Sequence, residues 1–173
     1  FNTYAQDMLD PTSELYRGQS DGVLLAVLAR DLGPAFTDAR APVETAAATA
    51  ATLGDLVAAF RAHSRSPLLI QGLEVPAAGG AERSGAVLVN ARLAELSRAV
   101  PAVHLLDYQA LIERHGVDGW NDERNWTTSR MPLANASLIH LAQAWLRFVV
   151  PIAGHSCKAL VTDLDNTLWG GVI

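Results

Sequence analysis

Short apolar runs alternate along this chain with longer segments of helical character, and this alternation limits the possible folds more than any other feature. Residues 23–28, 67–71 and 103–106 are the candidate strands. Continuous apolar runs of this length fit strands that are covered on both faces. Strands that are separated by helices usually form parallel sheets, so the order predicts an α/β domain with a mainly parallel sheet.

Helices are expected between and after these strands. The expected helices are residues 43–63, 86–100, 108–115 and 133–150. The first is rich in alanine, which has the highest helix propensity, and Gly54 inside it marks a kink or a short break. Asp107 can cap the third helix, and Gly116 can end it. Residues 72–83 are predicted as a loop, and residues 117–131 are polar and aromatic with little periodicity.

Composition excludes several classes of protein. Half of the residues are apolar, 18% are charged and the formal net charge is -5, which suits a compact globular chain and gives no reason to expect nucleic acid as a partner. The single cysteine, Cys157, excludes an internal disulfide and fits the cytoplasm. No apolar run approaches the roughly 20 residues that cross a bilayer, so no membrane association is expected.

The chain is expected to be a piece of a longer protein. It does not begin with methionine, and it stops shortly after a motif has begun. Proline and glycine in residues 151–156 mark the one plausible domain boundary. The predicted division is an α/β domain over residues 1–152 and the start of a second domain over residues 153–173.

The motif lies near the C-terminus, where a predicted strand over residues 159–162 leads into Asp163-Leu164-Asp165-Asn166-Thr167. Two acids one residue apart point to the same side of a strand, and a turn can aim both at the carboxyl end of a sheet, where ligands of α/β proteins bind. One carboxylate can attack phosphorus, and the other can serve as general acid and base. Two carboxylates that face a phosphate need a divalent cation, most simply Mg²⁺.

An ordinary turn after a strand is the alternative interpretation, because Asp-Asn-Thr is common turn chemistry. The apolar strand before the motif and Leu168-Trp169-Gly170-Gly171 after it favour a functional site.

Residues 163–173 resemble the first motif of FkbH-like proteins, a branch of the haloacid dehalogenase superfamily. Residues 9–16 and 120–126 resemble the N-terminal region of the same family, so the resemblance covers most of the chain. It implies that Asp163 is the nucleophile, that Asp165 is the acid/base and that Thr167 orients the turn. It also implies that the Asp163 carboxylate and the Asp165 carbonyl bind Mg²⁺, and that the chain ends with the first strand of a truncated Rossmann-like phosphatase domain.

The resemblance implies a role in polyketide biosynthesis. FkbH-like proteins dephosphorylate a phosphorylated three-carbon substrate, 1,3-bisphosphoglycerate, and load glyceryl onto an acyl carrier protein. Some relatives carry a cysteine between the two aspartates, where this sequence has Leu164. The later Ser/Thr, Lys and acidic metal ligands of the superfamily have no counterpart up to Ile173, so the fragment itself is expected to be inactive.

Residues 1–152 resemble the SGNH hydrolases, which form a flavodoxin-like three-layer sandwich. The family's Gly-x-Asn-Asp block falls on residues 28–31, with Leu28 at the Gly position and Arg30 at the Asn position. The Asp-x-x-His block falls on residues 122–125, with Asn125 in place of the histidine. An amide cannot act as a general base. A docking domain for a carrier protein is therefore the second functional hypothesis, and an esterase is the third.

Aromatic and charged residues of the 117–131 segment form a candidate substrate or partner surface, namely Trp120, Asp122, Arg124 and Trp126. Packing of this segment onto the sheet is the alternative. Arg124 and Arg130 are candidates for binding a phosphate or a phosphopantetheine arm. The five histidines show no metal-ligand spacing.

Overall fold

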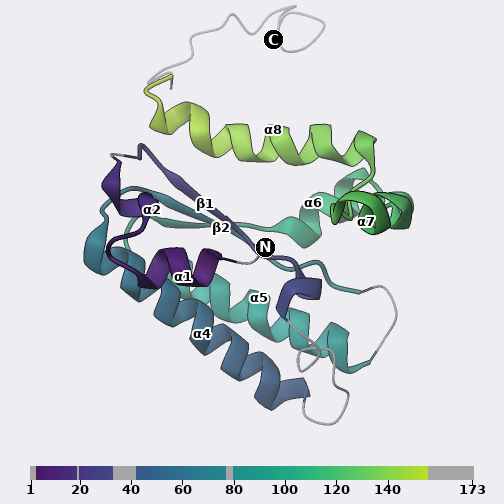
Figure 1. Ribbon diagram of the computed structural model, residues 1–173. Helices are drawn as coiled ribbons and strands as arrows, with labels where there is room; N and C mark the ends of the chain where they lie inside the picture. The colour runs from purple at the N-terminus through teal and green to yellow at the C-terminus, as the bar shows by residue number, and fades with distance from the viewer. Residues whose placement is uncertain (1–2, 19, 33–41, 77–79, 156–173) are drawn as a thin grey trace, which may run out of the picture.

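The computed structural model describes residues 3–18, 20–32, 42–76 and 80–155 (Figure 1). Its sheet consists of β1 (Val23–Ala26), β2 (Leu68–Gln71) and β3 (Val103–Leu106). Helices α4 (Pro42–His63) and α5 (Ala81–Ala99) lie on one face, and α8 (Asn135–Ile152) lies on the other. The predicted α/β fold with a parallel sheet is confirmed. The SGNH likeness stays a prediction, and the predicted strand 159–162 lies outside the described residues.

The three strands are parallel and lie in the order β1-β2-β3. Each strand is joined to the next by a helix that crosses the same face of the sheet, which is the usual connection between neighbouring parallel strands. The carboxyl ends of all three strands therefore meet at one edge of the sheet. Polar residues that follow the strands are brought together at this edge.

Several of the predicted boundaries agree with the structure, but α5 begins at Ala81, inside the predicted loop 72–83 and before the predicted start at residue 86. Strand β3 has the predicted bounds, as does α6 (Tyr108–His115); the Asp107 carboxylate accepts a hydrogen bond from Ala110 N at the start of α6, and Gly116 ends it with φ +102°. Helix α4 runs through Gly54, so the expected break is wrong. Strand β1 ends at Ala26, before the predicted residue, because the chain turns into the short helix η1 (Ala29–Leu32).

Besides η1, three short helices in the described residues were not predicted. They are α1 (Tyr4–Leu9), α2 (Glu14–Arg17) and α7 (Glu123–Ser129). Helix α1 is attached to the domain by Met8, whose side chain is buried, and by the Tyr16 hydroxyl, which donates a 2.6 Å hydrogen bond to the Met8 carbonyl oxygen. These helices are too short to be stable alone, so tertiary contacts hold them in place.

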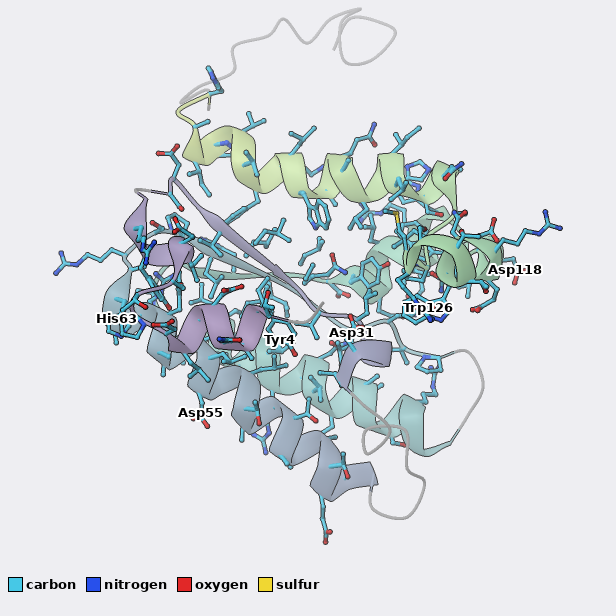
Figure 2. The ribbon with its side chains drawn as sticks, in the orientation of Figure 1. Tyr4, Asp31, Asp55, His63, Asp118 and Trp126 are labelled. Atoms are coloured by element: carbon cyan, nitrogen blue, oxygen red, sulfur yellow. The ribbon has the colours of Figure 1, made fainter. Side chains whose placement is uncertain are left out.

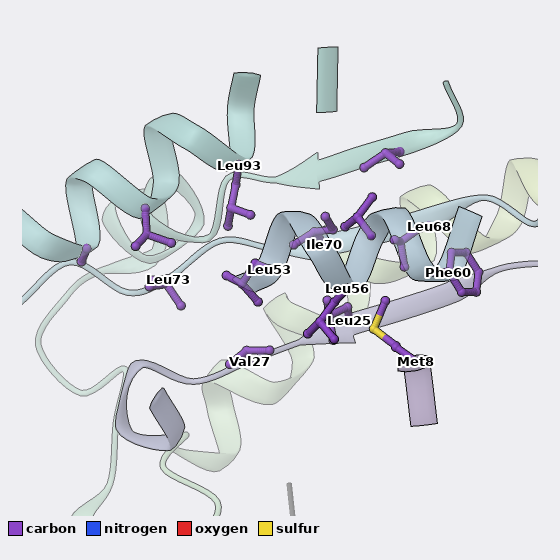
Figure 3. Close-up of a cluster of buried hydrophobic side chains, with 14 of the residues drawn as sticks. Met8, Leu25, Val27, Leu53, Leu56, Phe60, Leu68, Ile70, Leu73 and Leu93 are labelled. Atoms are coloured by element: carbon purple, nitrogen blue, oxygen red, sulfur yellow. The ribbon is translucent and has the colours of Figure 1, made fainter. Parts of the chain in front are cut away.

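The main hydrophobic core lies between the sheet and the helices α1, α4 and α5 (Figure 3). Phe60 of α4 and Leu68 of β2 are completely buried in it. Residues 43–63 are long and apolar enough for a membrane span by composition alone, with a mean hydropathy of 1.2. About 28% of this window is buried, and Leu53, Leu56 and Phe60 of α4 pack in the main core under the sheet. A second buried cluster joins α6, α8 and the 117–133 segment around Tyr108 and Trp120.

Arg61 holds the amino-terminal edge of the sheet together. Its guanidinium group donates hydrogen bonds to the carbonyl oxygens of Ser64, Ser66 and Ala102, at 3.2, 2.7 and 2.8 Å. Ser66 and Ala102 lie just before β2 and β3 respectively. One side chain of α4 therefore fixes the entrances to two neighbouring strands.

We expect Arg61→Met to lower the free energy of unfolding by about 2–4 kcal/mol, because hydrogen bonds from a charged donor are worth more than neutral ones and three carbonyl groups lose their donor. Chemical denaturation followed by circular dichroism measures the change. Arg65→Met is the matched control, since Arg65 is exposed and its replacement should shift stability by less than about 0.5 kcal/mol. Equal effects of the two replacements would show that Arg61 is not a structural link.

Candidate functional site

The predicted catalytic residues Asp163, Asp165 and Thr167, and with them the predicted Mg²⁺ ligands, lie outside the described residues. Their roles stay predictions. Within the described ranges, no group of three or more His, Cys, Asp or Glu side chains is placed to hold a metal ion.

The carboxyl edge of the sheet gathers polar side chains from separate parts of the chain. Asp31 follows β1 in η1, Glu74 follows β2, and Asp107 follows β3. Figure 2 shows Asp31 and Trp126 toward this end of the molecule. Burial raises the pKa of Tyr4, and the negative charge of nearby Asp31 raises it further. This edge is where parallel α/β sheets usually bind ligands.

The loop that carries Glu74 is held on both sides by amide side chains. The Asn90 Oδ1 atom accepts a hydrogen bond from Leu73 N at 2.7 Å, and Asn90 Nδ2 donates to the Leu73 carbonyl oxygen at 2.9 Å. The Gln109 Oε1 atom accepts a hydrogen bond from Val75 N at 2.8 Å. Because the residues before and after Glu74 are both fixed, its carboxylate has a defined position at the edge of the sheet.

Asn121 binds the Glu74 carboxylate directly. The Asn121 Nδ2 atom lies 2.9 and 3.0 Å from the two carboxylate oxygens. Beside this pair, Trp120 Nε1 donates a 2.9 Å hydrogen bond to the Tyr108 hydroxyl. Burial raises the pKa of Tyr108 to about 12, and the negative charge of Glu74 also raises it. The Tyr108 hydroxyl is buried, so the Glu74 carboxylate and the Asn121 amide are the groups of this cluster that could bind a polar ligand. The carboxylate could also transfer a proton, but the cluster contains no strong nucleophile.

The structure separates the four residues of the predicted surface. The prediction is wrong for Trp120, which is only 2% exposed and packs in the second core cluster. Asp122 accepts a hydrogen bond from Arg124 N at 2.8 Å and so caps α7. Arg124 is exposed, and Trp126 is half-buried with the Arg130 guanidinium 5.3 Å from its ring centre. Of the four predicted residues, only Asp122, Arg124 and Trp126 can contribute to a surface.

Asn125 has a structural role in the described fold. Its Nδ2 atom donates a 2.8 Å hydrogen bond to the Leu133 carbonyl oxygen, which links α7 to the segment before α8. An amide in this role supplies no general base. The geometry therefore gives no support to esterase chemistry at this position.

Glu74 and Asn121 were not identified from the sequence. Glu74 could have been found from its place shortly after a buried strand, since that is where ligand-binding residues of α/β sheets lie. Asn121 gives no such signal, because its partner is far away in the sequence.

Two histidines meet outside this edge. The rings of His115 and His140 stack with centroids 3.8 Å apart, which joins the end of α6 to α8. Desolvation lowers the pKa of His115, and the charges of His140, Arg114 and Arg147 lower it further. Stacked rings do not aim their nitrogen atoms at a common point, so the pair is no metal site.

No family model and no curated protein matches the chain. A crystal structure does: the N-terminal part of the protein BF1531 from Bacteroides fragilis, which contains a phosphatase domain and is complexed with Mg. The likeness covers 99% of this chain, with a TM-score of 0.78 and 18% sequence identity. The chain therefore shares an α/β fold with part of that protein. It spans about half of the length of that structure, 48%.

Proposed function

We propose that this chain is part of a Mg²⁺-dependent phosphatase of the haloacid dehalogenase type. The observation that carries the proposal is the Asp163-x-Asp165-x-Thr167 motif directly after an apolar run. The fold likeness to a Mg-bound protein with a phosphatase domain supports it. At the described carboxyl edge, Asp107 caps α6 and Glu74 is bound by Asn121, and the described residues include no group of acidic side chains placed to hold a metal ion.

The resemblance to FkbH-like proteins assigns the roles of the residues, and their chemistry fits these roles. Asp163 attacks the phosphorus atom, so that the bond to the leaving oxygen breaks and an aspartyl-phosphate forms. Asp165 gives a proton to the leaving oxygen and later takes one from the water that hydrolyses the aspartyl-phosphate. Both residues offer hard oxygen donors, the kind of ligand that Mg²⁺ prefers. The bound cation would offset the negative charge between the carboxylates and the phosphate.

The finer proposal is that phosphoryl removal is coupled to loading of a glyceryl-type acyl group onto an acyl carrier protein in polyketide biosynthesis. It rests on the resemblance of residues 9–16, 120–126 and 163–173 to FkbH-like proteins. The phosphorylated three-carbon substrate and the carrier protein are thus proposed partners. The exposed Arg124 is a candidate contact for the phosphate of either one.

Metal dependence tests the phosphatase proposal. We expect the complete polypeptide that contains this chain to hydrolyse p-nitrophenyl phosphate with Mg²⁺, to lose more than about 95% of that activity with a chelator, and to recover it when Mg²⁺ is restored. Hydrolysis of a p-nitrophenyl acyl ester is the parallel assay. Phosphatase activity that is insensitive to chelation, or ester cleavage alone, would contradict the proposal.

A further inference from the structure

The outer edge of β1 is open in the described part of the chain. Val23 N donates a 2.8 Å hydrogen bond to the Pro67 carbonyl oxygen, so the backbone groups of Val23 and Leu25 point toward β2. The backbone groups of Leu24 and Ala26 consequently point away from the sheet. The strand reads Val-Leu-Leu-Ala and has no charge or proline. Natural edge strands usually carry such protection, because a bare apolar edge recruits other strands.

Helix α8 is apolar on the side that faces solvent. Ile139, Leu146, Val149 and Val150 are 60%, 52%, 46% and 40% exposed, and their spacing by three, four or seven residues places most of them on one stripe. We call these four residues the α8 stripe. The neighbouring flank is polar, since His140 stacks on His115 there and Arg147 follows His140 by seven residues, two turns further along. Gln143 is a polar residue between Ile139 and Leu146 on the stripe itself. A helix that is apolar both toward the sheet and toward solvent is usually covered by another protein segment on its outer side.

A groove connects the edge and the stripe. It has a volume of about 300 Å³ and lies between the residues around the start of β1 and the last turns of α8, where Val149 and Ile152 line it. Its floor is close-packed: a Cβ atom on Gly22 would lie 3.2 Å from the Ile152 side chain. Val149 belongs to both the groove and the stripe, so the β1 edge, the groove and the stripe form one continuous surface. It is largely apolar, and Ser20 and Asp21 are the polar residues in the groove lining.

We propose that a strand–helix segment of the same polypeptide, from outside residues 1–173, covers this surface. The strand pairs in parallel with β1 through the Leu24 and Ala26 backbone groups, and the helix lies in the groove beside α8. A strand with a following helix fits both halves of the surface, and parallel pairing agrees with the other two pairs of the sheet. The similar crystal structure has about half of its chain outside the matched part, since the match covers 48% of it. This proposal does not depend on the phosphatase activity.

Residues 156–173 are a poor candidate for this segment. A helix along the stripe from Ile139 to Val150 would need about three turns. The sequence after the predicted strand 159–162 includes Asp165-Asn166-Thr167 and Gly170-Gly171. These residues favour a turn rather than a helix.

Lysine substitutions in two forms of the protein test the helix. Val149→Lys and Leu146→Lys should lower the melting temperature of the complete polypeptide by about 5 °C or more, because a charge would be buried. In residues 1–173 alone, where both positions are exposed, the shift should be less than about 1 °C. Val87→Lys is the control, because Val87 is 50% exposed on α5, outside the proposed surface, and it should change neither form. Equal small shifts in both forms would overturn the proposal.

Amide exchange tests the strand. The Leu24 and Ala26 amides should exchange at least about 100-fold more slowly in the complete polypeptide than in residues 1–173. Equal rates in the two forms would contradict strand pairing. Slow exchange of these amides already in residues 1–173 would also contradict it. If residues 1–173 then sediment as a dimer, a second copy covers the surface; if they sediment as a monomer, residues 156–173 cover it.

Discussion

Replacement of Asp163 by asparagine should reduce phosphate-ester hydrolysis by the complete polypeptide at least about 1,000-fold. An amide oxygen is a far weaker nucleophile than a carboxylate and cannot form the aspartyl-phosphate, and loss of a nucleophile removes most of the rate enhancement in enzymes of this kind. The measurement is kcat for p-nitrophenyl phosphate in saturating Mg²⁺. The asparagine side chain has nearly the same volume as the aspartate side chain, so the variant should keep the fold.

Asp118→Asn is the matched control, because Asp118 is exposed in the loop after α6 (Figure 2) and has no part in the proposed chemistry. It should leave kcat unchanged. A second diagnostic is the phosphorylated intermediate, which should be trapped on the parent protein and absent from Asp163→Asn. If Asp163→Asn kept its activity while melting at the parent temperature, another residue would be the nucleophile.

Replacement of Phe60 by alanine should lower the free energy of unfolding by about 3–5 kcal/mol, since it removes a buried aromatic ring and leaves a cavity. The Phe60 side chain is 0% exposed, and the Tyr16 ring lies against it with centroids 6.0 Å apart. A domain of this size has a total stability of about 5–15 kcal/mol, so the loss is a large part of it. Denaturant unfolding followed by circular dichroism gives the value.

Val87→Ala is the control for this prediction, because Val87 is 50% exposed on α5 and alanine is the better helix former. Its effect should lie within about 0.5 kcal/mol of zero. A comparable loss for both replacements would mean that the Phe60 region is not the main core.

Elements with local signals could be predicted from the sequence. The bounds of α6 were correct because Asp107 supplies the capping carboxylate and Gly116 the left-handed conformation that ends the helix. Helix α7 has the cap Asp122, but it ends at Arg130 with φ +58°, a conformation that only the folded context can impose on arginine. Its polar sequence also has no apolar period from which a helix could be read.

The residues at the carboxyl edge depend on contacts that no local pattern encodes. Asn121 and Glu74 lie 47 positions apart and meet only because the segment between α6 and α7 lies beside the residues that follow β2. Trp120 was proposed as a surface residue because tryptophan in a polar segment often marks an interface. The hydrogen bond to the buried Tyr108 hydroxyl satisfies its one polar atom inside the core.

The strand order β1-β2-β3 follows the order of the chain, and this has a consequence for how the protein is made. All of the buried residues of the main core lie between Met8 and Val103, whereas the second cluster begins at Tyr108. When β2 and β3 leave the ribosome, the preceding strand with which each one pairs has already been synthesised. The main core can therefore pack before α8 has been synthesised. Helix α8 then covers the other face of these three strands.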